Sequence, residues 1–152
     1  MASARVERAR QLAARYPAAR EILDRYAHLA AAAPTPEGLC ACDPKQPVAS
    51  VLRDGLRSLL CAECGCEWPY PRIECPFCQE QEFAKLPRFS DETRYPHIRV
   101  EACDTCKCYL LSIDLSKDGH AIPEVDELAA LPLNLWAQQQ GYSRRHPNLL
   151  GL

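Results

Sequence analysis

The chain has 152 residues, of which 47% are hydrophobic and 25% are charged, and its formal net charge is -2. This balance is typical of a folded globular protein, and the slight acidic excess argues against a polyanion binder. Ten residues are cysteine. Because neither a signal peptide nor an apolar run of membrane-spanning length is recognisable, we expect a cytoplasmic protein, in which closely spaced cysteines favour metal ligation over disulfides.

Two helices are predicted in the N-terminal segment 1–33. Apolar residues recur at helical spacing over residues 4–16, and the spacing resumes at Ile22, after Pro17. Since proline suits the first turn of a helix and disrupts its interior, we interpret this as two short helices that meet at Pro17, with one kinked helix as the alternative. Both apolar stripes are interpreted as packing surfaces. The proline-containing segment 34–39 is the predicted linker.

Short β-strands are predicted between the cysteines. Residues 48–53 and 56–60 are β-prone runs around Asp54-Gly55, a dipeptide typical of a two-residue hairpin turn because it tolerates positive φ. The prolines within 68–73 confine a strand there to a sheet edge. Three further short strands are predicted, at 83–86, 98–102 and 109–114.

The C-terminal segment 116–152 is predicted to be helical from Pro123 until Gly141. Pro123 can occupy a first helical turn, and acidic residues follow it near the positive end of the helix dipole. Because Pro132 lies inside this span, we expect a kink or two shorter helices. Five apolar residues are interpreted as its packing stripe: Val125, Leu128, Leu131, Leu135 and Trp136.

Cysteine spacing predicts two metal sites. A Cys-x-x-Cys unit lets one tight turn direct both sulfurs to a single point, as a tetrahedral thiolate site requires. Pairing the clusters in chain order gives four ligands to each site, and the alternative pairs the two inner clusters instead. The predicted ligands are Cys40, Cys42, Cys61 and Cys64 for the first site, and Cys75, Cys78, Cys103 and Cys106 for the second.

Two further cysteines and two histidines lie outside this scheme. Cys66 and Cys108 each follow a Cys-x-x-Cys unit by two residues, and we interpret them as small buried thiols beside the sites, with ligation as the alternative. His97 and His120 lack a spacing partner and are expected at the surface. Four sulfur ligands suit iron and zinc alike, and they leave no coordination position open for metal-centred hydrolysis. We therefore expect two structural metal ions and no enzyme.

Together these patterns predict an α+β fold. Two tandem rubredoxin-like or zinc-ribbon modules of short antiparallel strands, residues 40–74 and 75–115, are flanked by N-terminal and C-terminal helices.

Four motifs follow one another in a distinctive order. They are Pro47-Val-Ala-Ser-Val-Leu-Arg53, Leu60-Cys-x-x-Cys-Gly-x-Glu-Trp68, Arg72-Ile-Glu-Cys-Pro-x-Cys78 and Glu101-Ala-Cys-Asp-x-Cys106-x-x-Tyr-Leu110. With them the chain resembles the formate dehydrogenase accessory protein family, FdhE. The resemblance implies tandem rubredoxin-like modules in a cytoplasmic protein that binds a formate dehydrogenase catalytic subunit during its maturation, rather than oxidising formate itself. A homodimer is compatible with this interpretation, and neither nucleic acid nor membrane is favoured as a partner.

Some positions depart from the family pattern. Asp43 falls where a ligand partner for Cys40 is expected, with Cys42 as the alternative ligand, and the chain is shorter than is usual for the family. Lys107 stands where glycine is usual, at a position where positive φ is costly for a side chain. Two other functions remain as alternatives, a zinc-ribbon nucleic-acid-binding module and a rubredoxin-like redox protein.

Overall fold

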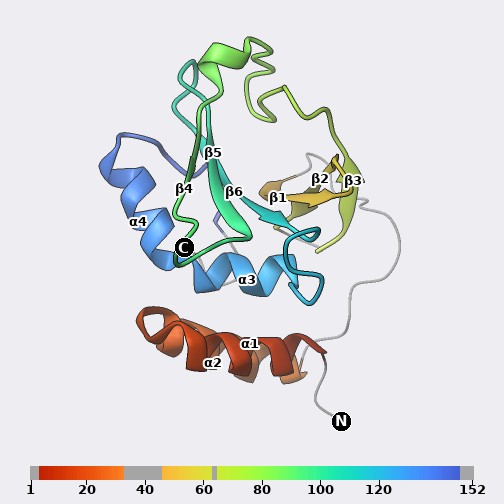
Figure 1. Ribbon diagram of the computed structural model, residues 1–152, viewed down its shortest axis with the longest axis vertical. Helices are drawn as coiled ribbons and strands as arrows, with labels where there is room; N and C mark the ends of the chain where they lie inside the picture. The colour runs from red at the N-terminus through yellow and green to blue at the C-terminus, as the bar shows by residue number, and fades with distance from the viewer. Residues whose placement is uncertain (1–3, 33–45, 63–64, 148–152) are drawn as a thin grey trace.

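The computed structural model describes residues 4–32, 46–62 and 65–147 (Figure 1). The predicted linker 34–39 lies outside these ranges. The chain begins with α1 (Ala4–Arg15) and α2 (Arg20–Ala32), which are joined by the 3-10 turn η1 (Pro17–Ala19). The prediction of two helices is confirmed, because the helical path breaks at Tyr16, just before proline.

Six strands form one sheet in the order β3-β2-β1-β6-β5-β4. The strands are β1 (Pro47–Arg53), β2 (Leu56–Cys61), β3 (Glu67–Pro69), β4 (Arg88–Ser90), β5 (Ile98–Ala102) and β6 (Tyr109–Asp114). Every neighbouring pair is antiparallel except β1 and β6, which pair in parallel with Ala49 opposite Leu111. This parallel pair joins the strands that precede Cys75 to those that follow it.

The predicted hairpin turn and edge strand agree with the structure, whereas one predicted strand does not. Asp54 and Gly55 have φ values of 50° and 80°, as the predicted hairpin turn between β1 and β2 requires. The strand expected within 68–73 is confined to an edge, as predicted, and ends at Pro69. The strand predicted at 83–86 is wrong: Phe83–Lys85 is a 3-10 turn, η2, and the strand begins only at Arg88.

Two helices close the described chain. They are α3 (Pro123–Ala129) and α4 (Leu131–Gln139), so the expected break near Pro132 is present, at Ala130. Val125 and Leu128 are buried as predicted. Leu135, in contrast, is 50% exposed and does not belong to the packing stripe.

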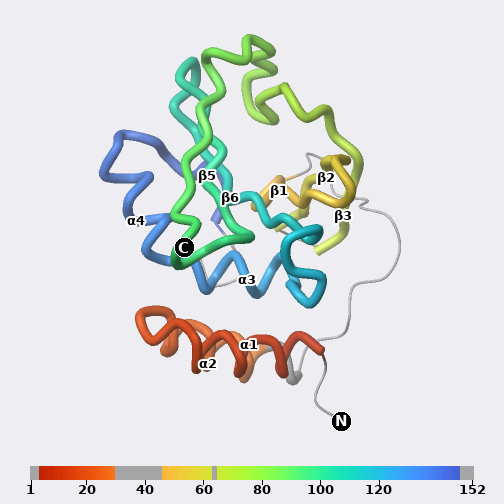
Figure 2. Tube along the Cα trace, in the orientation of Figure 1, coloured from red at the N-terminus to blue at the C-terminus, as the bar shows by residue number. Residues whose placement is uncertain are grey.

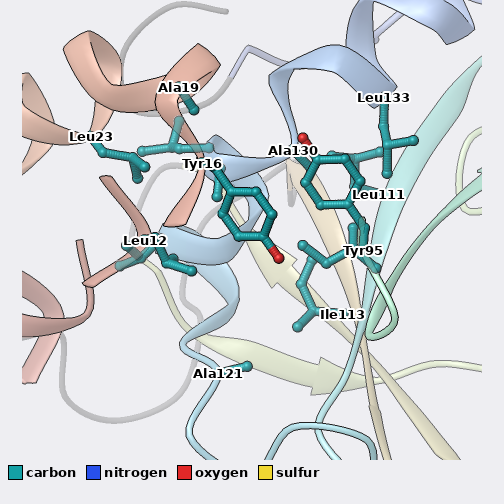
Figure 3. Close-up of a cluster of buried hydrophobic side chains, with 14 of the residues drawn as sticks. Leu12, Tyr16, Ala19, Leu23, Tyr95, Leu111, Ile113, Ala121, Ala130 and Leu133 are labelled. Atoms are coloured by element: carbon teal, nitrogen blue, oxygen red, sulfur yellow. The ribbon is translucent and has the colours of Figure 1, made fainter. Parts of the chain in front are cut away.

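The helices and the sheet are arranged in layers (Figure 2). The α1–α2 hairpin lies beneath α3, and α3 separates it from the sheet (Figure 1). Side chains from all three layers meet in one apolar core, where the rings of Tyr16 and Tyr95 stack with centroids 5.0 Å apart (Figure 3). The N-terminal helices are thus part of the main core.

A buried charged cluster adds a polar contact between these layers. Asp126 of α3 is 0% exposed, and it accepts hydrogen bonds from Arg8 of α1 at 2.6 and 3.0 Å. The ring Nε2 of His97 lies 2.8 Å from the same carboxylate, and Asp118 accepts from Arg8 at 2.8 Å. Burial by itself would raise the pKa of Asp126, but the bonds from His97 and Arg8 hold it below its ordinary value. The buried carboxylate is therefore kept ionised.

Replacing the cation of this cluster should loosen the α1–α2 layer. Arg8→Leu is expected to lower the free energy of unfolding at neutral pH by about 3 kcal/mol, because Asp126 would stay buried without its arginine. Arg10→Leu, at an exposed position of the same helix, is the control. The lowered pKa of Asp126 stabilises the fold above about pH 4, and that contribution is lost as the pH falls through the folded pKa. Urea unfolding at several pH values should show the Arg8→Leu deficit shrinking towards pH 3, and a constant deficit would contradict this account.

Candidate metal centre

The segment 103–108 folds into a tight loop with two backbone hydrogen bonds. The N–H of Lys107 donates to the carbonyl of Cys103 at 2.9 Å, and the N–H of Cys103 donates to the carbonyl of Cys108 at 3.0 Å. Lys107 has a φ of 61°, so the positive φ expected at this position is confirmed. We call such a six-residue loop a knuckle.

The same knuckle occurs twice more. In the knuckle 75–80 the two equivalent bonds are 2.9 and 2.8 Å long, and in the knuckle 61–66 they are 3.0 and 2.9 Å long. The fifth residue again has positive φ, 63° at Gln79 and 74° at Gly65. A repeated cysteine spacing thus corresponds to the same two backbone hydrogen bonds and the same positive φ, which at the first cluster involve Cys61, Gly65 and Cys66.

Two knuckles face each other across the second predicted site. Sγ atoms of Cys75, Cys78, Cys103 and Cys106 lie within 4.8 Å of one another. Cys75 and Cys106 have their sulfurs 3.7 Å apart, and Cys78 and Cys103 have theirs 3.6 Å apart. A tetrahedron with metal–sulfur bonds of about 2.3 Å has edges of about 3.8 Å, so the donor set fits a tetrahedral thiolate ion.

The structure also decides between the pairings that the spacing left open. The knuckle 75–80 faces the knuckle 103–108, as pairing in chain order requires, and the inner pairing is not adopted. Cys75, Cys78, Cys103, Cys106 and Cys108 are not joined in disulfides within the described ranges.

The pKa values of three of the four clustered thiols, Cys75, Cys103 and Cys106, are shifted in different directions. Burial raises the pKa of Cys75 to about 11 and also raises that of Cys106. Burial would raise the pKa of Cys103 as well, but backbone hydrogen bonds from Cys106 and Thr105 hold it below its ordinary value. A cation that binds all four sulfurs must displace protons from them, so its affinity should fall as the pH falls.

The C-terminal tail packs against this site, which the sequence patterns did not indicate. Ser143 forms backbone hydrogen bonds with Lys107 and Tyr109, at 2.7 and 3.1 Å. The guanidinium of Arg145 lies 3.8 Å from the Cys108 sulfur and 5.6 Å from the centre of the Phe77 ring. Tail residues therefore contact both knuckles.

The two further cysteines and the two histidines differ in burial from one another. Cys66 and Cys108 are buried at the sixth position of their knuckles, as expected, and Cys108 is outside the group of four sulfurs. His120 is exposed as predicted. The surface prediction for His97 is wrong, because its ring is buried beside Asp126.

The first predicted site is described only at Cys61, which is buried. Cys40, Cys42, Asp43 and Cys64 lie outside the described residues.

Comparison with known proteins places these features in a family. The model of the FdhE C-terminal domain matches residues 73–150, which contain the whole four-sulfur group. The chain belongs to this family.

Its relatives agree with this assignment. The FdhE homologue of Pseudomonas aeruginosa is 37% identical over 120 residues, which are 74% of this chain and 39% of the relative. The homologue of Stutzerimonas stutzeri is 40% identical over 119 residues, 74% of this chain and 38% of the relative. The crystal structure of the Pseudomonas aeruginosa FdhE protein matches with a TM-score of 0.66 and 40% identity, covering 74% of this chain and 40% of that one. The chain thus spans about two fifths of the length of these FdhE proteins.

None of the helices in the described ranges has the length and apolarity needed to cross a bilayer.

The positive φ at the fifth position of the knuckle 75–80 predicts a stabilising substitution. Gln79→Gly is expected to raise the free energy of unfolding by about 0.5–1 kcal/mol, because glycine adopts positive φ without a steric cost. Gln11→Gly, at an exposed position within α1, should instead lower it by about 1 kcal/mol. Denaturant unfolding of both variants at equal metal content tests the sign, and a loss of stability at position 79 would contradict the role of the backbone conformation.

The four sulfurs should differ from the neighbouring thiol in their effect on metal content. Cys78→Ser and Cys106→Ser are each expected to release one metal ion per chain and to unfold the knuckles 75–80 and 103–108. The reason is that thiolate sites contribute about 10–16 kcal/mol of apparent binding free energy to folding. Cys108→Ser should retain the ion. Elemental analysis with circular dichroism measures both effects, and equal metal loss in all three variants would show that Cys108 ligates.

Proposed function

We propose that this chain is a non-enzymatic accessory protein that binds a formate dehydrogenase catalytic subunit and supports its maturation in the cytoplasm. Membership of the FdhE family supports a role shared with those proteins. The observation that carries the non-enzymatic part is the closed group of four sulfurs, which leaves an ion no vacant position at which a substrate could bind.

The metal sites serve to hold a binding surface in shape. Iron and zinc both accept four thiolates, and the group of four sulfurs would hold either ion. The third knuckle, 61–66, supports a second ion bound by Cys40, Cys42, Cys61 and Cys64, because its backbone bonds match those of the other two. On this proposal the chain carries two rubredoxin-like modules that share one sheet.

Deleting the gene and restoring it with variants tests the proposal. Loss of formate dehydrogenase activity on deletion is expected, with recovery by the wild-type chain and by Cys108→Ser but not by Cys78→Ser. The catalytic subunit should co-purify with the chains that restore activity. Unchanged activity after deletion, together with no co-purifying subunit, would refute the assignment.

Metal analysis of the purified chain separates this proposal from a redox carrier. A colourless chain with two zinc ions supports a structural role. An iron-loaded chain with reversible one-electron chemistry would support electron transfer instead.

A further inference from the structure

The outer edge of β4 pairs with no further strand in the part of the chain that the structure describes. β4 is the terminal strand of the sheet, and its partner there is β5. Backbone contacts extend this pairing beyond β4, since Ala102 donates to the carbonyl of Pro87 at 3.0 Å and Asp104 to that of Lys85 at 2.8 Å. Pro87 and the three residues of β4 therefore form the edge of the sheet, with the 3-10 turn η2 just before them, and such edges are templates for strand addition.

A groove of about 480 Å³ runs between this edge and α4. Its apolar lining consists of Phe89, Pro132, Leu133 and Trp136, and the rings of Phe89 and Trp136 meet edge to face with centroids 4.9 Å apart. In Figure 1, α4 lies beside the end of the sheet that β4 forms. The volume is within the range of known ligand sites, and a tryptophan beside arginine is typical of energetically important interface positions.

The charge beside the β4 edge is positive. The groove lining includes Arg94 and its partner Asp91, 2.9 Å apart, and part of Arg88. The hydrogen bond described for Arg88 is to the carbonyl of Arg72, at 3.2 Å, rather than to a carboxylate. On the next strand, Arg99 lies 3.7 Å from Glu101, a carboxylate already held by Arg57 at 2.7 Å. Cations outnumber carboxylates beside this edge, so an acidic ligand would complement it.

Strand geometry then specifies how that ligand is patterned. Side chains alternate between the two faces of a sheet, so Phe89 points towards α4 while Arg88 and Ser90 point to the opposite face, where Ser90 is opposite Arg99. A seventh strand beside β4 would place every second side chain over Phe89 and Trp136. Its remaining side chains would face Arg88 and Arg99.

We propose that this edge and groove bind an extended segment of a partner protein in which apolar and acidic residues alternate. The segment adds to the sheet as a strand next to β4, with its apolar side chains in the groove of α4 and its carboxylates beside Arg88 and Arg99. The inference rests on the proposed function only in taking the ligand to be a protein.

Synthetic peptides of defined pattern test this directly on the full metal-loaded chain. The probe is a fluorescein-labelled octapeptide in which glutamate alternates with valine or leucine. It should bind at least tenfold more tightly than a peptide of the same composition with its glutamates in one block, and tenfold more tightly than the matched lysine peptide. Fluorescence anisotropy gives the affinities. Equal affinity for the alternating and block peptides would overturn the proposal, as would absence of binding.

Chain variants locate the site. Arg88→Glu should reverse the preference, so that the lysine peptide binds more tightly than the glutamate peptide. Arg10→Glu, on the exposed face of α1, should leave it unchanged. Circular dichroism confirms that both variants are folded. An unchanged preference in Arg88→Glu would place binding elsewhere and refute the assignment to β4.

N-methylated peptides distinguish strand addition from simple charge attraction. Alternate amides of a strand point to opposite edges, so methylating one alternate set should abolish binding while methylating the other set leaves it intact. Equal effects of the two sets would contradict strand addition. Concentration-dependent dimerisation that Arg88→Glu abolishes would show that a second copy covers this edge and would also overturn the proposal. If the peptides fail but a formate dehydrogenase subunit still co-purifies, the proposed function stands and this inference fails.

Discussion

Four sulfurs within 4.8 Å of one another impose the strongest constraint on this structure. The chain leaves the site after Cys78 and must return to it at Cys103, so the residues between them have to double back. They do so as β4 and β5, an antiparallel pair whose register places Arg88 opposite Glu101. The edge strand and the turn before it are therefore positioned by the thiol site as well as by their own hydrogen bonds.

A buried arginine extends this constraint to the other half of the sheet. Arg57 of β2 donates to Ser50 at 3.0 Å and to Glu101 of β5 at 2.7 Å. It also donates to the carbonyls of Pro71 and Glu74, both at 2.9 Å, in the segment that leads into Cys75. One guanidinium thus fixes two strands and the approach to the metal ligands, a geometry that the five donors of arginine make possible.

Features that depend on neighbouring residues could be predicted from the sequence, whereas those that depend on distant contacts could not. The turn at Asp54 and the helix break near Pro132 follow from the backbone preferences of glycine, aspartate and proline. The β-prone run at 83–86 predicted a strand, but it forms a 3-10 turn. Its apolar Phe83 is 64% exposed, and the sequence alone could not show that this side chain would stay unpacked. Within the site, cysteine spacing predicted that the knuckle 75–80 and the knuckle 103–108 come together. The tail at Arg145 and the burial of His97 depend on residues far away in the chain, so no local pattern could indicate them.

Parallel pairing of β1 with β6 also has a consequence for how the protein is made. The β1–β2 hairpin leaves the ribosome early, but its inner edge has no partner until the chain has been synthesised through Asp114. Contacts so distant in sequence form slowly, and an unpaired strand is prone to aggregate in the meantime. An ion held by the four sulfurs would tie the segment that follows β3 to the segment that precedes β6, and this link would shorten the time for which the inner edge of β1 stays unpaired.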